Sequence, residues 1–231
     1  GDLLQEMEIP IHKIGSGEVT YLSLIKKVAE SQLPTILSTG MSTLSEVEDA
    51  YRAFVSTGNH KLILMHCTSN YPASYKDLNL RAMKTLDQAF NCPVGYSDHS
   101  LGIHVPVAAV SLGACVIEKN FTLNNKMAGP DHRASLEQSD FKRMIEQIRD
   151  IENSLGSSIK QPVASEEEMR QVARRSLVAS QSISTGTIIK PELLKFKRPG
   201  TGIPQKFMNI IIGRTARCDI SKDEILQWEM F

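Results

Sequence analysis

The sequence predicts an α/β fold, the C-terminal part of a (β/α)8 TIM barrel, followed by a second, smaller and β-rich domain. Three observations lead to this prediction. Short continuous apolar runs recur along the first two thirds of the chain, segments of helical periodicity separate them, and the composition changes after Gly156. Continuous rather than alternating runs are typical of strands that are buried on both faces of a parallel sheet.

Five strand–helix units follow one another in the first domain, residues 1–156. The expected strands cover residues 11–14, 35–38, 62–67, 94–96 and 115–118, and the expected helices begin near residues 22, 44, 78, 103 and 141. Thr43 and Glu46 predict a capping box, because the hydroxyl can accept a free backbone N–H and the carboxylate can reach back to the cap. Repeated units of this kind are typical of a parallel sheet.

Polar residues follow every expected strand. In a (β/α) barrel these strand ends form the active-site face, and a doubly wound open sheet would also gather ligand groups there. The polar strand ends, and the absence of a G-x-G-x-x-G sequence, favour the barrel. A closed barrel needs eight strands and five are expected, so the chain is either the C-terminal part of a barrel or an open sheet.

The second part of the chain has a different composition. Residues 157–171 are polar, charged and proline-containing, which is typical of a linker, and residues 172–231 alternate short strands with turns. Residues 179–188 match residues 216–225 in an alanine, an Ile-Ser pair, a turn residue and a final isoleucine. The match indicates two copies of a strand–turn–strand unit that close one small β core, with coincidence as the alternative.

The balance of charge narrows the class of function. The chain has 26 basic and 26 acidic side chains and a sequence pI of about 7.2, so we expect no nucleic-acid or membrane partner. No apolar run approaches the roughly 20 residues of a membrane span. The four cysteines form no C-x-x-C pair, which predicts reduced thiols in a cytoplasmic protein.

Candidate functional residues lie at the strand ends. Lys13 would be costly inside a barrel without an anion, so it predicts phosphate or carboxylate binding, with Glu18 as its partner. His99 is either a metal ligand or general base, or a hydrogen-bonded structural histidine, and Asp98 could orient its ring. Small hydroxyl donors at neighbouring strand ends suit an anionic substrate, and these are Ser38, Thr39, Ser69 and Ser97.

Three further positions have two interpretations each. Asp131 and His132, in the loop 128–133, could be catalytic or could cap the following helix. Arg198 lies in the basic loop 197–202, for which a solvated hairpin is the simpler interpretation. An unrelated aldolase would need a Schiff-base lysine inside the barrel, and Lys119 is the candidate for that role.

Six motifs occur in register along almost the whole chain. They are Lys-Ile-Gly-Ser-Gly-Glu at 13–18, Leu-Ser-Thr-Gly-Met at 37–41, His-Cys-Thr-Ser-Asn-Tyr-Pro at 66–72, Gly-Tyr-Ser-Asp-His at 95–99, Gly-Pro-Asp-His at 129–132 and Lys-Arg-Pro-Gly at 197–200. Together they resemble the N-acetylneuraminate (sialic acid) synthase family, which includes legionaminic, pseudaminic and spore-coat polysaccharide synthases. Residues 172–231 resemble that family's antifreeze-like (SAF) domain, which has a β-clip fold.

The resemblance implies a transferase that condenses phosphoenolpyruvate with N-acetylmannosamine, or a related N-acyl amino sugar, to give a nine-carbon 2-keto acid and phosphate. It implies a domain-swapped homodimer in which Arg198 reaches the active site of the partner subunit. The implied phosphoenolpyruvate ligands are Lys13, Glu18, Ser38, Ser69 and Ser97. The implied sugar contacts are Tyr71, Asp131 and Arg198, and the implied catalytic residues are His99, Tyr71 and Asp131.

The resemblance also implies a divalent ion, manganese or magnesium, that would polarise the aldehyde of the sugar, with His99 as one ligand. The family's second ligand is a histidine, and this sequence has Asn120 there, whose amide oxygen a hard cation accepts. The family's N-terminal barrel strands have no counterpart in these residues. An impaired fragment or paralogue that binds carbohydrate or assists assembly is therefore the alternative function.

Overall fold

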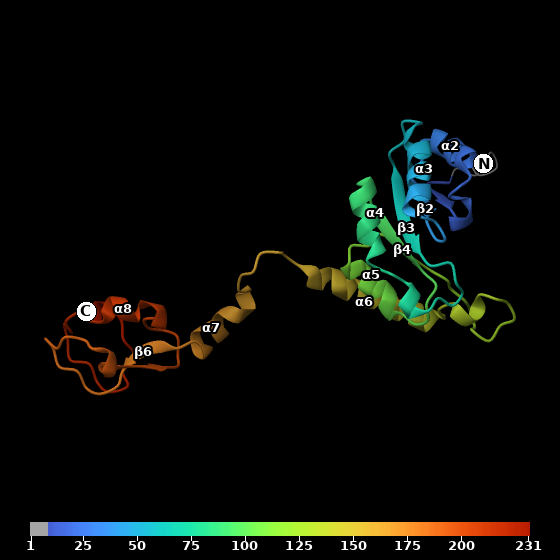
Figure 1. The fold of residues 1–231 in the computed structure, drawn as a ribbon. Coiled ribbons are helices and arrows are strands. Elements are labelled where there is room, and N and C mark those ends of the chain that lie inside the picture. The colour runs from blue at the N-terminus through green and yellow to red at the C-terminus, as the bar shows by residue number, and fades with distance from the viewer. Residues whose placement is uncertain (1–8) are drawn as a thin grey trace. The chain divides into compact units, whose positions relative to one another are not determined.

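The structure is a computed structural model that describes residues 9–231. Contacts between residues divide the chain into two compact units, 1–156 and 157–231, and each is described by itself. The first contains a parallel sheet with helices, and the second contains short antiparallel strands (Figure 1).

A five-stranded sheet forms the centre of the first unit, with its strands in the order in which they occur along the chain. The strands are β1 (His12–Ile14), β2 (Thr35–Ser38), β3 (Leu62–Cys67), β4 (Val94–Asp98) and β5 (Ile117–Lys119). Every neighbouring pair is parallel. The carboxyl ends of all five strands therefore lie at one edge of the sheet, which confirms the predicted parallel α/β arrangement.

A helix follows each strand of the sheet. The helices are α2 (Leu22–Glu30), α3 (Leu44–Val55), α4 (Ala82–Phe90), α5 (His104–Ser111) and α6 (Gln138–Leu155). The predicted capping box is confirmed, since Thr43 Oγ1 accepts from the backbone N–H of Glu46 at 3.3 Å and Glu46 Oε2 accepts from that of Thr43 at 2.7 Å. Helix α4 begins four residues later than expected because Asn79, at φ 46°, has a left-handed backbone that no helix can include.

Apolar side chains from the helices pack on the sheet. Ile25 and Ala29 of α2, Phe54 of α3, and Leu37 and Leu64 of the strands are completely buried. The continuous apolar character of the strands reflects this packing, because their residues are covered rather than alternately exposed. Within the described residues, no helix is both long enough and apolar enough to cross a membrane.

The second unit is held together by a small β core. Its regular elements are α7 (Glu167–Ala173), β6 (Ser176–Ala179), β7 (Leu194–Lys197) and α8 (Met208–Ile211). The segment predicted as a linker is therefore helical in part, because α7 begins within it. Strands β6 and β7 pair antiparallel, and the apolar residues buried beneath them include Leu177, Ile189 and Leu226.

The predicted repeat of the second unit is confirmed by reciprocal hydrogen bonds between its copies. Ile183 and Ile220 each donate their N–H to the carbonyl of the other at 2.8 Å. The N–H of Gly186 donates to the Ala216 carbonyl at 2.8 Å, and the N–H of Asp223 donates to the Ala179 carbonyl at 2.9 Å. Equivalent positions of the two copies thus exchange equivalent bonds.

Asp223 gives the second unit an acid-sensitive contact. Its carboxylate binds the ammonium groups of Lys195 and, at 2.7 Å, of Lys197, and these hydrogen bonds lower the pKa of Asp223 from 3.8 to about 2. A carboxylate with a lowered pKa in the folded state stabilises it above the unfolded value, and this contribution is lost as the pH falls towards 2.

We therefore expect Asp223→Asn to lower the stability of the second unit near neutral pH and to lose less stability than wild type between about pH 4 and pH 2. Asparagine tolerates the left-handed backbone of this position, φ 70°, so the substitution tests the charge. Urea unfolding followed by the fluorescence of Trp228, the single tryptophan, is the measurement. Glu192→Gln, at an exposed position, is the control, and parallel pH profiles of Asp223→Asn and wild type would contradict the expectation.

Candidate active site

The carboxyl ends of the strands surround one pocket of about 350 Å³. Its lining residues come from four strands, β1, β2, β4 and β5, and from the loops that follow β1 to β4, and they are Lys13, Gly15, Ser16, Gly17, Ser38, Met41, Ser69, Tyr71, Ser97, His99 and Glu118. Six of the residues predicted from the sequence are in this set, namely Lys13, Ser38, Ser69, Tyr71, Ser97 and His99. The structure therefore brings together predicted residues that are as far apart in the sequence as Lys13 and His99.

Lys13 provides the positive charge of the pocket. Its ammonium group donates to Ser38 Oγ at 2.8 Å and lies 3.3 Å from Glu118 Oε2. The side chain is 35% exposed, so it remains accessible from solvent. The prediction that Glu18 is the partner of Lys13 is wrong. Glu18 lies exposed in the short helix Ser16–Glu18, and Glu118 makes the ion pair with Lys13 instead.

Glu118 is the main site residue that sequence reasoning missed. Its Oε1 accepts a hydrogen bond from Ser97 Oγ at 2.7 Å, while its Oε2 faces Lys13. The signal that could have found it is its position in the last strand, one residue before Lys119. Because alternate residues of a strand point to opposite faces, Glu118 must face away from Lys119.

Ser16 forms another part of the pocket wall, and Gly40 contacts it from behind the lining residues. The N–H of Gly40 donates to Ser16 Oγ at 3.0 Å, and Ser16 Oγ lies 3.1 Å from the sulfur of Cys67. A Cβ atom at residue 40 would overlap Ser69 Oγ and would lie 2.9 Å from both Cys67 Sγ and Ser16 Oγ. Glycine at this position therefore allows the three side chains to converge.

We expect Gly40→Ala to weaken anion binding in this pocket about tenfold or more, because the added methyl group must push hydroxyl donors from their places. The measurement is calorimetric titration with phosphoenolpyruvate, with the melting temperature recorded in parallel. Unchanged affinity in a variant that folds normally would contradict the expectation, since it would show that the hydroxyls are free to move.

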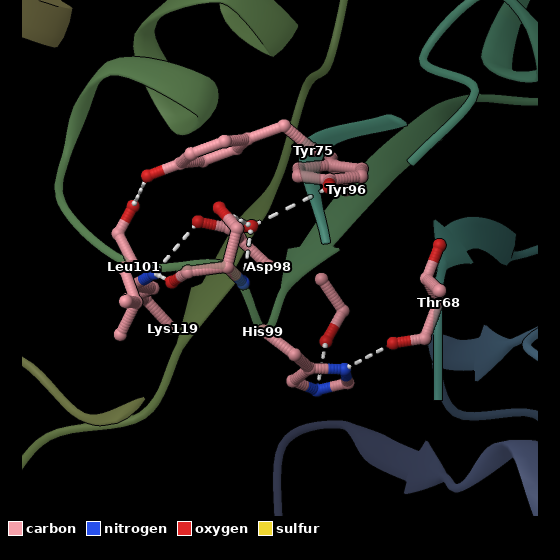
Figure 2. Close-up of polar contacts among 9 residues, drawn as sticks. Thr68, Tyr75, Tyr96, Asp98, His99, Leu101 and Lys119 are labelled. Carbon is pink, nitrogen blue, oxygen red and sulfur yellow. Dashed lines mark hydrogen bonds and ion pairs between the residues drawn. The ribbon is translucent and has the colours of Figure 1, made fainter. Parts of the chain in front are cut away.

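His99 has a fixed ring orientation. Its Nδ1 donates to the backbone carbonyl of Thr68 at 2.8 Å, and Nε2 lies 3.5 Å from Ser97 Oγ (Figure 2). The ring of Tyr71 lies beside it, with 4.1 Å between ring centroids. Because a carbonyl can only accept, the neutral ring carries its proton on Nδ1 and leaves Nε2 free to accept a proton or bind a ligand.

Asp98 does not orient His99, so that prediction is wrong. Its Oδ1 accepts from the N–H and hydroxyl of Ser100 at 3.0 and 2.8 Å, and its Oδ2 accepts from Lys119 Nζ at 2.7 Å. Figure 2 shows the Asp98 carboxylate on the side of Lys119 and Tyr96, away from the imidazole. The physical reason is strand alternation: neighbours in sequence face opposite sides of β4.

Lys119 is enclosed rather than available for a Schiff base. Its side chain and that of Asp98 have no exposed surface, and Lys119 also donates to the Ser100 carbonyl. It does not line the pocket. The structure therefore gives no support to an aldolase that uses this lysine.

Tyr71 stands at the mouth of the pocket, half exposed. Desolvation raises the pKa of its hydroxyl, and the electrostatic influence of the neighbouring Cys67, Asp131 and Glu118 raises it further. Tyr71 is therefore held in the protonated form, which can donate a hydrogen bond to a polar ligand.

Four of the site residues that the family resemblance implies are not among those that line this pocket, and neither are the candidates Thr39 and His132. The four are Glu18, Asn120, Asp131 and Arg198. Asn120 follows β5 directly, and its backbone carbonyl accepts from the N–H of Leu136 at 2.8 Å. Arg198 follows β7 in the second unit and is exposed there.

The predicted metal ion finds no complete set of ligands. Among residues 9–231, no three His, Cys, Asp or Glu side chains come together as a metal-binding group. His99 contributes one free nitrogen, and both carboxylate oxygens of Glu118 are engaged by Lys13 and Ser97. These residues alone do not fit a divalent ion, so no chemical step is derived through one.

The arrangement of polar groups at the carboxyl ends of parallel β/α strands defines a class of protein, the (β/α)-barrel enzymes, whose ligands bind at this face. The pocket's single ammonium group and its serine hydroxyls are suited to a small anion.

Comparisons with known proteins identify the family within that class. Residues 1–160 match the NeuB family model, and residues 174–231 match the SAF domain model. The chain belongs to the NeuB family, which confirms the family resemblance and the small SAF domain. It is 44% identical over 228 residues to an N,N'-diacetyllegionaminic acid synthase of Campylobacter jejuni, an alignment that covers 98% of this chain and 68% of the relative.

Two further relatives support the assignment. A human N-acetylneuraminate-9-phosphate synthase is 32% identical over 232 residues, which cover 99% of this chain and 64% of the relative. The crystal structure of a spore coat polysaccharide biosynthesis protein from Bacillus subtilis superimposes with a TM-score of 0.65 at 34% identity, over 99% of this chain and 69% of that one. The barrel-type fold is thereby confirmed, and the chain spans about two thirds of the length of these relatives.

Proposed function

We propose that this chain is the C-terminal part of a sialic-acid-type synthase that condenses phosphoenolpyruvate with an N-acyl amino sugar. The observation that carries the proposal is the convergence of Lys13 with serines from three other strand ends and loops on one pocket of about 350 Å³. The relatives named as synthases of nine-carbon sugar acids support it.

Phosphoenolpyruvate has a phosphate and a carboxylate on a three-carbon frame, so it needs positive charge and many hydrogen-bond donors in a small space. Lys13 supplies the charge, and the hydroxyls of Ser38, Ser69 and Ser97 supply donors within the same pocket. Charge-assisted hydrogen bonds of this kind are the stronger ones in proteins.

The proposed reaction forms one carbon–carbon bond and one carbon–oxygen bond, the latter to the oxygen of water, and breaks the carbon–oxygen bond to the phosphate. Carbon 3 of phosphoenolpyruvate attacks the aldehyde of the open-chain sugar, and the aldehyde oxygen takes up a proton. Water adds to carbon 2, which becomes a keto group as the bond to the phosphate oxygen breaks and phosphate leaves. Lys13 and the serine hydroxyls stabilise the charge that develops on the phosphate.

The sugar is assigned to the other side of the pocket. Tyr71 can donate to a sugar oxygen, and the free Nε2 of His99 can accept a hydrogen bond or a proton from a sugar hydroxyl or from the reacting water. Asp131 joins them in the proposal, since its charge is close enough to affect Tyr71. Arg198 would contact the N-acyl group of the sugar from the second subunit of a domain-swapped homodimer. The proposal also places the protein in the cytoplasm.

The proposal is tested by the release of phosphate from phosphoenolpyruvate, with N-acetylmannosamine or a diacetamido hexose and manganese present. We expect phosphate and a nine-carbon keto acid in equal amounts. The protein should include any residues that precede this chain in the same coding sequence. Binding of both substrates without turnover would reject activity, and sugar binding that needs no phosphoenolpyruvate would favour the carbohydrate-binding alternative.

The divalent ion that the family resemblance implies, for which these residues alone are not a complete ligand set, has its own test at Asn120. Replacement of the amide by an imidazole, Asn120→His, is expected to raise manganese affinity roughly 10–100-fold, because a first-row divalent ion binds nitrogen more strongly than an amide oxygen. Calorimetric titration with manganese chloride measures the effect. Asn153→His, which adds a histidine at an exposed position of α6, is the control, and equal affinity in both variants would exclude Asn120 from any metal site.

A further inference from the structure

Two residues of β4 lie directly opposite two residues of β5, and the side chains of both pairs are in contact. In the register of these strands Ser97 faces Glu118, and Asp98 faces Lys119. The first pair is at the pocket, where Ser97 Oγ donates to Glu118 Oε1 at 2.7 Å. The second pair is on the other face of the strands, completely buried, with 2.7 Å between Lys119 Nζ and Asp98 Oδ2.

Strand β5 has little else to fix its register. It is three residues long, and among the described strands it pairs only with β4. A slip of one residue along β4 would turn every side chain of β5 to the opposite face. Glu118 would then leave the pocket, and Ser97 and Lys13 would lose the carboxylate they now contact.

The buried pair belongs to a network of hydrogen bonds that a slip of β5 would break. Asp98 accepts four hydrogen bonds, from the N–H and hydroxyl of Ser100, from the Tyr96 hydroxyl at 3.4 Å and from Lys119 (Figure 2). Lys119 also donates to the Ser100 carbonyl, so the segment that carries His99 is held on both sides. Further along, the hydroxyl of Tyr75 donates to the Leu101 carbonyl at 3.1 Å.

Stability alone is a poor explanation for a buried ion pair. The cost of removing two charges from water often equals or exceeds their attraction, and apolar replacements of the same size are frequently as stable. What a buried pair of this kind supplies is a unique alignment, because any displacement leaves both charges without partners.

We propose that the Asp98–Lys119 pair is a register lock, which positions Glu118, Ser97 and His99 around the ligand of the pocket. Asp98 and Lys119 are positioning residues, since neither lines the pocket. The statement about the ligand rests on the proposed function, whereas the statement about register concerns the chain by itself.

The test is the double variant Asp98→Asn with Lys119→Met, which removes both charges and keeps the size of both side chains. Native-state hydrogen exchange is measured for the backbone amides of β5 and of β3. A register lock predicts that β5 amides lose protection about tenfold more than β3 amides, because opening is local. An equal loss of amide protection in both strands would overturn the proposal, since the pair would then contribute only to global stability. No loss of protection in either strand would also overturn it, since the pair would then not hold β5.

The control removes a surface pair that also joins one acidic and one basic side chain. Glu48→Gln with Arg52→Gln breaks the exposed ion pair within α3 and should leave both strands unchanged. If the buried double variant does not fold, Ser100→Ala deletes one donor to Asp98 and retains the charges. It should increase exchange selectively at β5 by about threefold, and uniform exchange would again overturn the proposal.

Phosphoenolpyruvate affinity separates this inference from the function. Calorimetry on wild type and the double variant is expected to show binding about tenfold weaker in the variant, as for other residues that orient ligands through a neighbour. Loss of β5 protection without any binding to wild type would leave the register lock intact and reject the proposed ligand. Equal affinity in a variant whose β5 has opened would reject the positioning role.

Discussion

Replacement of Lys13 by methionine is expected to weaken phosphoenolpyruvate binding roughly 100-fold, because a hydrogen bond to a charged group contributes up to about 3 kcal/mol. Lys13 is the only basic ammonium or guanidinium group among the residues that line the pocket. The remaining donors are neutral hydroxyls, and Glu118 adds a negative charge that an anionic ligand must overcome. Methionine keeps the length of the side chain and removes the charge.

Calorimetric titration with phosphoenolpyruvate at moderate ionic strength measures the effect of Lys13→Met. Lys61→Met is the matched control, because Lys61 is exposed and its ammonium group only donates to the Gln32 carbonyl at 3.2 Å. We expect the control to bind as wild type does. A Lys13→Met protein that binds within threefold of wild type would show that the anion is held elsewhere.

Asp98→Ala is expected to destabilise the first unit by about 3–5 kcal/mol, because the change leaves the Lys119 ammonium buried without its counter-ion. The hydroxyl and N–H of Ser100 would lose their acceptor as well. The Lys119 ammonium group and the Ser100 donors cannot turn to water instead, since the Lys119 side chain and Ser100 have no exposed surface. The loss therefore exceeds what most single substitutions cause.

The two units can be observed separately in this experiment. Trp228, in the second unit, is the single tryptophan, so its fluorescence reports that unit, while far-UV circular dichroism follows helices α2 to α6. Urea unfolding should shift to lower concentration for the dichroism signal alone. Asp49→Ala, an exposed aspartate on α3, should change stability by less than about 0.5 kcal/mol. A similar small change for Asp98→Ala would mean that Lys119 finds another partner.

The strands and their ends could be predicted because their signals are local. Continuous apolar runs mark strands covered on both faces, and polar residues directly after them mark the edge where parallel strands meet. Lys13, Ser38 and Ser97 could be placed at one site by this argument without any contact being known. The start of α4 could not, because Asn79 adopts a backbone that few residues adopt and no periodicity reveals it.

The partners of these residues were less predictable than their positions. Lys13 pairs with the distant Glu118 in β5 and not with Glu18, which is close to it in the sequence. Proximity in sequence is a weak guide where a sheet brings distant strands together. Asp98 and His99 are neighbours that face opposite sides of β4, so alternation should have excluded their contact.

The paired halves of the second unit have a consequence for how it folds. Because the Gly186 amide is satisfied by Ala216 and the Asp223 amide by Ala179, each half completes the backbone of its twin. Neither half holds a closed set of partners by itself, so each half depends on the other for its backbone hydrogen bonds. We therefore expect the two halves of the SAF unit to form and unfold together, in one cooperative step.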